Sequence, residues 1–370
     1  MANLAKTCRS AHELVQSFLP RAFNINAALR RFFKEPLKFR SLQRESGMLI
    51  SGSFALQFLD RTVYDDSDLD LYCNFQDREK MGLWLMNDEG YTFAPNSLQD
   101  PDFRQASADA PHVIDLGPYV NLRGISTVFT FTKKVRENSE DVRKVQLIVV
   151  HRSPMEAILN YHSSWWPIPV TFSHTHRSCL AATVMNVIAY DYAYSLYPRA
   201  TFEERLFLLC VRKAHRHVAA IDKYRERGFI ILHEKTARDP MVWKICDNTI
   251  FPTQIPRWMG DEYTWRLPLS LDGLESRPAV DDEGDRALTT DPCFVTSWTH
   301  ELALKDIALS RTAPISVESR IKYDVVAMNA YKYRYVCAPY SRSRLVTVMA
   351  LLMHLYNLAP IDSGDTDTQS

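Results

Sequence analysis

The sequence lacks the patterns that mark several large protein classes. Its seven cysteines are scattered and include no C-x-x-C pair, so neither a disulfide framework nor a zinc site is indicated. We therefore expect reduced thiols and an intracellular protein, cytoplasmic or nuclear. We also expect no signal peptide, because charges interrupt the first apolar stretch. We expect no membrane span either, because the longest apolar segments, 180–196 and 345–359, contain polar residues.

Other absences narrow the function. No G-x-x-x-x-G-K-[ST], G-x-G-x-x-G or G-x-S-x-G motif occurs, which leaves P-loop, dinucleotide-binding and α/β-hydrolase folds without support. The 44 Lys and Arg balance 44 Asp and Glu, so the chain does not hold nucleic acid by bulk charge, although a local basic surface remains open. With 46% hydrophobic residues in 370, the chain is long enough for one large domain or two to three smaller ones.

The first 47 residues are basic and are predicted to be helical. They contain nine Lys and Arg against three Glu, with five phenylalanines between them. We interpret this segment as an amphipathic helical cap on the core, with a surface that faces a polyanion as the alternative.

The next hundred residues predict a compact αβ unit. An apolar run leads into a Gly-Ser turn, and alternation of Leu69, Leu71 and Cys73 with polar residues predicts a strand. Ser153, Pro154 and Glu156 have the spacing of a helix start. The other expected elements are helices at 54–59 and 78–90, and strands at 125–135 and 144–150 joined as a hairpin.

The second half is predicted to be mostly helical. We expect a buried helix over 178–196, and a second helix from Thr201 to about Arg227 that Gly228 ends. Basic side chains on this second helix are solvated or line the site described next. Further expected elements are short strands within 229–300, an acidic loop at 271–291, helices near 300–310 and 345–358, and a disordered tail at 361–370.

The strongest chemical signal is the pair Asp68 and Asp70. Side chains at i and i+2 of a strand share one face, with Cα atoms about 6–7 Å apart. Two carboxylates at 4 Å repel by about 4 kcal/mol at an effective dielectric near 20. A divalent cation removes that cost, and Mg²⁺ takes one or two carboxylates together with phosphate oxygens. The pair therefore indicates a magnesium site.

Gly52 and Ser53 complete the pattern. Gly52 allows close approach of the backbone to a phosphate, and Ser53 offers a hydroxyl and an amide at a helix N-terminus, where an anion is favoured. Gly52-Ser53, a spacer and then Asp68-Leu69-Asp70 resemble the signature of the DNA-polymerase-β-like nucleotidyltransferase superfamily.

The resemblance implies an α+β fold, with a nucleotidyltransferase-like mixed sheet flanked by helices and followed by the mostly helical second region with some short strands. It implies that Asp68 and Asp70 bind Mg²⁺ or Mn²⁺ and that Gly52 and Ser53 bind the phosphates of a nucleoside triphosphate. The corresponding domains are 1–47 (basic helical segment), 48–165 (nucleotidyltransferase-like domain) and 166–360 (accessory domain).

The resemblance also implies a third acid on a later strand, and here the chain departs from it. The expected position holds Gln146, which cannot accept a proton. Loss of a general base costs about 10²- to 10⁴-fold in rate. Asp115, Glu140 or Asp141 could substitute from nearby, with Asp115 favoured because its flanks are apolar.

Two functions follow. The first is Mg²⁺-dependent transfer of a nucleoside monophosphate from a nucleoside triphosphate to an unidentified hydroxyl, on a short RNA end, a small molecule or a protein. The second is a catalytically inactive relative that binds a nucleotide or acts as a scaffold. Neither requires a membrane or an obligate protein partner.

Overall fold

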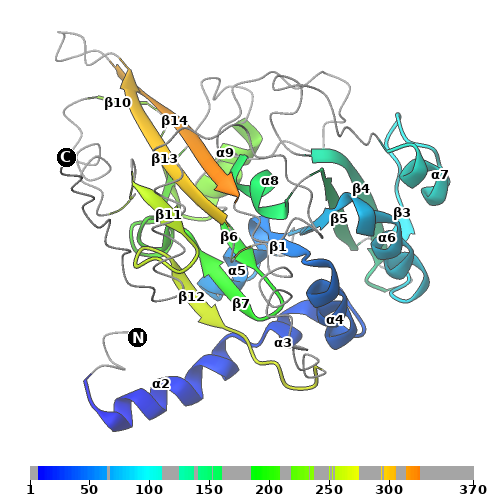
Figure 1. Ribbon diagram of the computed structural model, residues 1–370, viewed down its shortest axis with the longest axis horizontal. Helices are drawn as coiled ribbons and strands as arrows, with labels where there is room; N and C mark the ends of the chain where they lie inside the picture. The colour runs from blue at the N-terminus through cyan, green and yellow to red at the C-terminus, as the bar shows by residue number, and fades with distance from the viewer. Residues whose placement is uncertain are drawn as a thin grey trace, which may run out of the picture.

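An eight-stranded mixed sheet organises the molecule (Figure 1). The computed structural model describes residues 7–64, 67–110, 125–136, 141–151, 153–160, 185–208, 218–232, 234–236, 250, 252, 255–274, 293, 296–305 and 314–325. In spatial order the strands are β12 (Trp265–Pro268), β7 (Tyr192–Ser195), β6 (Asn186–Ile188), β1 (Leu49–Ser51), β2 (Leu69–Asn74), β5 (Val142–Val150), β4 (Ile125–Lys134) and β3 (Thr92–Phe93). β2 and β5 run parallel, and the other neighbouring pairs run antiparallel.

The basic N-terminal segment is helical, as the sequence predicts. Its helices are α2 (Arg9–Ala22), α3 (Ile25–Leu29) and α4 (Pro36–Ser46). α4 has Pro36 in its first turn and ends at Gly47, whose φ of 66° is left-handed. The segment packs on the sheet as a cap, as its pattern indicates, because its residues Phe23, Phe32, Phe33 and Phe39 are buried in one cluster with residues of β1 and β2.

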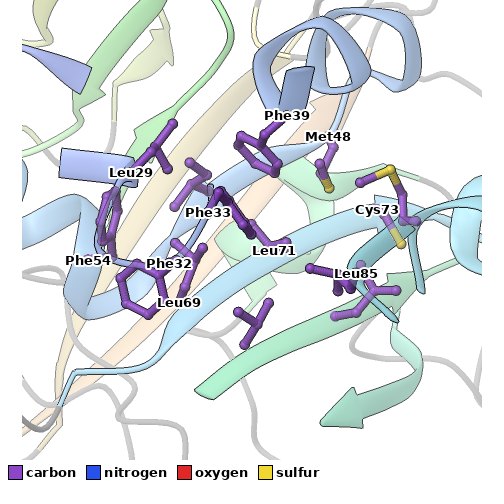
Figure 2. Close-up of a cluster of buried hydrophobic side chains, with 14 of the residues drawn as sticks. Leu29, Phe32, Phe33, Phe39, Met48, Phe54, Leu69, Leu71, Cys73 and Leu85 are labelled. Atoms are coloured by element: carbon purple, nitrogen blue, oxygen red, sulfur yellow. The ribbon is translucent and has the colours of Figure 1, made fainter. Parts of the chain in front are cut away.

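The cap and one face of the sheet share a single hydrophobic core. Phe32 and Phe33 are almost fully buried and belong to the same cluster as Leu69 and Leu71 of β2. Figure 2 shows these rings beside the two leucines and beside Phe54. The alternation that predicts β2 thus reflects one face of the strand that packs against the cap.

The sequence predicts only some of the other elements of the first half. α5 (Gly52–Asp60), α6 (Arg78–Asn87) and α8 (Pro154–Asn160) lie close to their expected positions, whereas α7 (Phe103–Ala108) and the short 3₁₀ turn Phe75–Asp77 were not expected. The hairpin expected from 125–150 is formed by the antiparallel pair β4 and β5.

The second half differs from the sequence-based expectation. Where described, the segment expected to be a buried helix at 178–196 forms β6 and β7, which continue the central sheet beside β1. All residues of these strands except Tyr192 are buried, so the strands lack the alternation of buried and exposed positions by which a sequence separates a strand from a buried helix.

The helix expected from Thr201 to Arg227 is also wrong in its first part. A π-helical turn, Arg199–Glu203, leads into β8 (Leu206–Leu208), and only α9 (Val218–Glu226) is helical among the described residues that follow. Gly228 does follow its end, with φ 81°. β8 pairs with β9 (Ile230–Leu232) in a two-stranded sheet.

A separate four-stranded sheet replaces the helix expected near 300–310 as far as Lys305. Its order is β10 (Glu234–Thr236), β14 (Pro314–Val325), β13 (Thr296–Lys305) and β11 (Pro256–Trp258). The second half is thus predominantly β among its described residues, and not mostly helical. Most of the acidic loop, the helix at 345–358 and the tail lie outside the described residues.

The sheet crosses the domain boundary expected near residue 165. β1 pairs with β6, and β12 extends the same sheet through β7. Arg40 of α4 adds a buried polar link, donating to the carbonyl oxygens of Ser270 at 2.7 Å and of Tyr190.

Of the helices that the structure describes, none has the length and apolar character to cross a membrane.

Candidate functional site

The turn between β1 and α5 brings Gly52 against Asp70. Ser51 of β1 lies opposite Asp70 of β2 in the antiparallel register. Gly52 has φ 71°, and a Cβ atom added to it would lie 2.2 Å from Asp70 Oδ2. Both the backbone conformation and the close approach therefore require glycine. The Gly-Ser turn and the acid pair, separate in sequence, form one site.

The two carboxylates have different surroundings. Asp68 lies just before β2 and accepts from Lys144 Nζ at 2.9 Å. Asp70 is partly buried in β2, against Gly52. Burial and the charge of Asp68 raise the pKa of Asp70 to about 7, against a smaller opposing effect of Lys144 and Lys223. The site thus holds a carboxylate that is costly to ionise while no cation neutralises it.

Ser53 belongs to a hydrogen-bonded network that positions the loop before Asp68. The hydroxyls of Ser53 and Ser67 lie 2.9 Å apart, and Gln57 donates to Ser67 Oγ and to the Ser53 carbonyl oxygen. The Gln57 side-chain oxygen accepts from the Tyr64 backbone N–H at 2.7 Å. Because Gln57 is almost fully buried, the network fixes the position of both serine hydroxyls.

The N-terminus of α5 lies at the same point. Its N-cap residue, Ser51, does not accept from the helix, since its hydroxyl donates to the Asn186 carbonyl oxygen at 2.7 Å. The first turn of α5 contains no acidic residue. The positive end of the helix dipole is therefore not offset by an acidic side chain of that turn and favours an anion.

Gln146 occupies the position where the resemblance implies a third acid. In the parallel pairing of β2 and β5 it lies opposite Asp70, and it is buried. In the amide orientation that satisfies its neighbours, the nitrogen donates to Asp70 Oδ1 at 3.1 Å and the oxygen accepts from Lys144 Nζ at 2.9 Å. An amide between a carboxylate and an ammonium is well hydrogen-bonded but cannot act as a base.

Of the three residues that could substitute for the third acid, none that the structure describes lies at the site. Asp141 precedes Gln146 by five residues of extended chain, about 16 Å along the strand, and is exposed. Asp115 and Glu140 lie outside the described residues. Within the part of the chain that is described, no three His, Cys, Asp or Glu residues group as metal ligands.

Sequence reasoning missed Lys144, Gln57 and the role of Ser67. For Lys144 a signal exists, because it stands two residues before Gln146 and so shares its face of β5. For Gln57 none does, because a buried glutamine in an apolar helix has no sequence pattern of its own.

Helix α9 supplies part of the basic surface that the sequence leaves open. Ile221 and Tyr224 pack with Phe207 against Leu56 of α5. Lys223 is close enough to lower the pKa of Asp70. Arg227 lies over the Tyr64 ring, 3.8 Å from its centroid. The basic residues at 212–216 lie outside the described residues.

Comparison with known proteins adds no relative: no family model, curated protein or solved structure matches this chain.

Proposed function

We propose that this chain binds a magnesium–nucleoside triphosphate at Gly52, Ser53, Asp68 and Asp70, and transfers its nucleoside monophosphate to a hydroxyl. The observation that carries the proposal is the contact of Asp70 with Gly52. A carboxylate is held against a left-handed glycine at a helix N-terminus, beside a second carboxylate. Without a bound cation the surroundings of Asp70 disfavour its ionised form, and a bound cation and phosphate would make use of each part.

The residues present suit one magnesium ion. Mg²⁺ binds proteins through one or two carboxylates and takes its remaining ligands from phosphates and water. Asp68 and Asp70 would hold it, and it would supply charge neutralisation and alignment of the triphosphate. The serine hydroxyls and the N-terminus of α5 would bind phosphate oxygens. Lys223 would add positive charge on the side of α9.

A second candidate function is nucleotide binding without turnover. It is favoured by Gln146, which lies beside Asp70 where transfer chemistry requires a proton acceptor. The acceptor, whether a short RNA end, a small molecule or a protein, is relevant only to the first function.

The test has two readouts, nucleotide affinity and pyrophosphate release. We expect each of the four ribonucleoside triphosphates, titrated with Mg²⁺, to raise the melting temperature, and Asp68→Asn to abolish the shift. Asp88→Asn is the control, because Asp88 forms an exposed ion pair with Lys38. A shift that Asp68→Asn leaves intact, or no shift with any nucleotide, would refute the proposal.

Pyrophosphate release separates the two functions. Steady release by the native chain that Asp68→Asn abolishes supports transfer. Binding without release supports the inactive relative. In that case Gln146→Asp restores the missing proton acceptor, and we expect release to begin in this variant.

A further inference from the structure

Lys144 lies within the acid pair and not at its edge. Its ammonium is 2.9 Å from Asp68 Oδ2, and the two side chains are only 25% and 36% exposed. β5 runs parallel to β2, with Val145 opposite Leu69, so the register itself places Lys144 beside Asp68. The ion pair is therefore fixed by the pairing of two central strands of the sheet.

Gln146 holds Lys144 from a second side. Its amide oxygen accepts from Lys144 Nζ at 2.9 Å, while its nitrogen donates to Asp70 Oδ1 at 3.1 Å. The four groups form one continuous chain, from Asp68 through Lys144 and Gln146 to Asp70. An amide suits this place because it presents an acceptor to the ammonium and a donor to the carboxylate, which an ionised carboxylate at position 146 could not do.

From this geometry we infer that Lys144 supplies the second positive charge of the site, so that the nucleotide is bound with a single divalent cation. The inference rests on the proposed function. With Lys223 of α9 left aside, ionised Asp68 and Asp70 together with Lys144 carry a net charge of −1, and one divalent cation brings it to +1. Three carboxylates with two divalent cations, the arrangement that the resemblance implies, also reach +1. Replacing an acid by Gln146 and adding Lys144 thus preserves the charge offered to a triphosphate.

The decisive measurement is the number of Mn²⁺ ions in the nucleotide complex. The native chain is saturated with a triphosphate whose α,β-bridging oxygen is replaced by methylene, and bound Mn²⁺ is counted by electron paramagnetic resonance. We expect one ion per chain. In the double variant Lys144→Ala/Gln146→Asp, which has three carboxylates and no ammonium, we expect two.

Single variants test the charge of Lys144 by a readout other than activity. Lys144→Met should raise the nucleotide concentration needed for half-maximal binding at saturating Mn²⁺ by about tenfold, the size expected for loss of one nearby charge. Lys144→Arg keeps the positive charge, so we expect it to bind the nucleotide as the native chain does. Lys80→Ala is the matched control, because Lys80 pairs with Glu45 at the same 2.9 Å on the exposed surface.

The outcomes distinguish this inference from the function on which it rests. Two Mn²⁺ ions in the native complex would overturn the inference and leave nucleotide binding intact. An unchanged nucleotide affinity of Lys144→Met at saturating Mn²⁺ would also overturn it. Failure of every triphosphate to bind would overturn both.

Discussion

Replacing Asp70 by asparagine should stabilise the ligand-free protein while it destroys the site. Burial and Asp68 raise the pKa of Asp70 from 3.8 to about 7. Each unit of pKa shift corresponds to about 1.4 kcal/mol, so keeping Asp70 ionised in the folded state costs at most about 4 kcal/mol above pH 7, and less in proportion to the solvent that reaches this partly buried side chain. The asparagine side chain would keep the hydrogen bond from Gln146 and would remove this cost.

The gain in stability expected from Asp70→Asn should depend on pH. The folded state binds a proton at Asp70 below about pH 7, whereas the unfolded chain binds it only below about pH 4. Between these values the folded state holds more protons, so the native protein loses stability from this group as pH rises. The substituted amide does not titrate. The advantage of Asp70→Asn should therefore be near zero at about pH 4, grow through this interval and level off above about pH 7.

Urea unfolding followed by tryptophan fluorescence measures the effect. At about pH 8 we expect Asp70→Asn to raise the free energy of unfolding by about 2–4 kcal/mol, with the upper value set by the full pKa shift. Asp68→Asn is the comparison. Its partly exposed ion pair with Lys144 should change the free energy of unfolding by only about 1 kcal/mol or less. Destabilisation by Asp70→Asn at this pH, or a gain that does not change with pH, would show that Asp70 is not strained by its surroundings.

Two further predictions concern the backbone of the site and its attachment to the cap. Gly52→Ala should destabilise the protein by about 1–2 kcal/mol from its positive φ alone, and should abolish nucleotide binding because its Cβ displaces Asp70. Gly228→Ala, with a similar φ and no atom within 4 Å of the new Cβ, should show only the backbone cost in the same urea titration and keep nucleotide binding. Arg40→Met should lower the free energy of unfolding by about 1–3 kcal/mol, because it removes the buried donor of two partly buried carbonyl oxygens. A loss below about 0.5 kcal/mol in thermal unfolding would contradict that role for Arg40.

The sequence predicted the Gly-Ser turn, helix α5 and strand β2 because local signals agree there. A short apolar run, a glycine with an unusual backbone and a two-residue alternation each have a direct structural cause. The sequence did not predict β6 and β7, since strands of three and four residues that are buried on both faces have no period to read. Their place beside β1 depends on the pairing of Ile50 with Ile188, two residues far apart in the chain.

Some residues of the candidate site could likewise be predicted from the sequence, and others could not. Asp68, Asp70, Gly52 and Ser53 stand in one short stretch of the chain and carry a recognisable order. Lys144 becomes visible only through the parallel register of β5 on β2, a feature of tertiary structure. The identity of Gln146 was readable from the sequence, whereas its hydrogen bonds to both neighbours required the structure.

The parallel pairing of β2 and β5 at the centre of the sheet affects the order in which the protein folds during synthesis. Asp70 and its partner Gln146 lie far apart in the chain, which must pass through α6, α7 and β4 before β5 can dock. During synthesis both acids therefore emerge well before the lysine and the amide that balance them. Until β5 arrives, the half-built sheet exposes a strand edge next to two uncompensated negative charges, which discourages pairing with a neighbouring nascent chain.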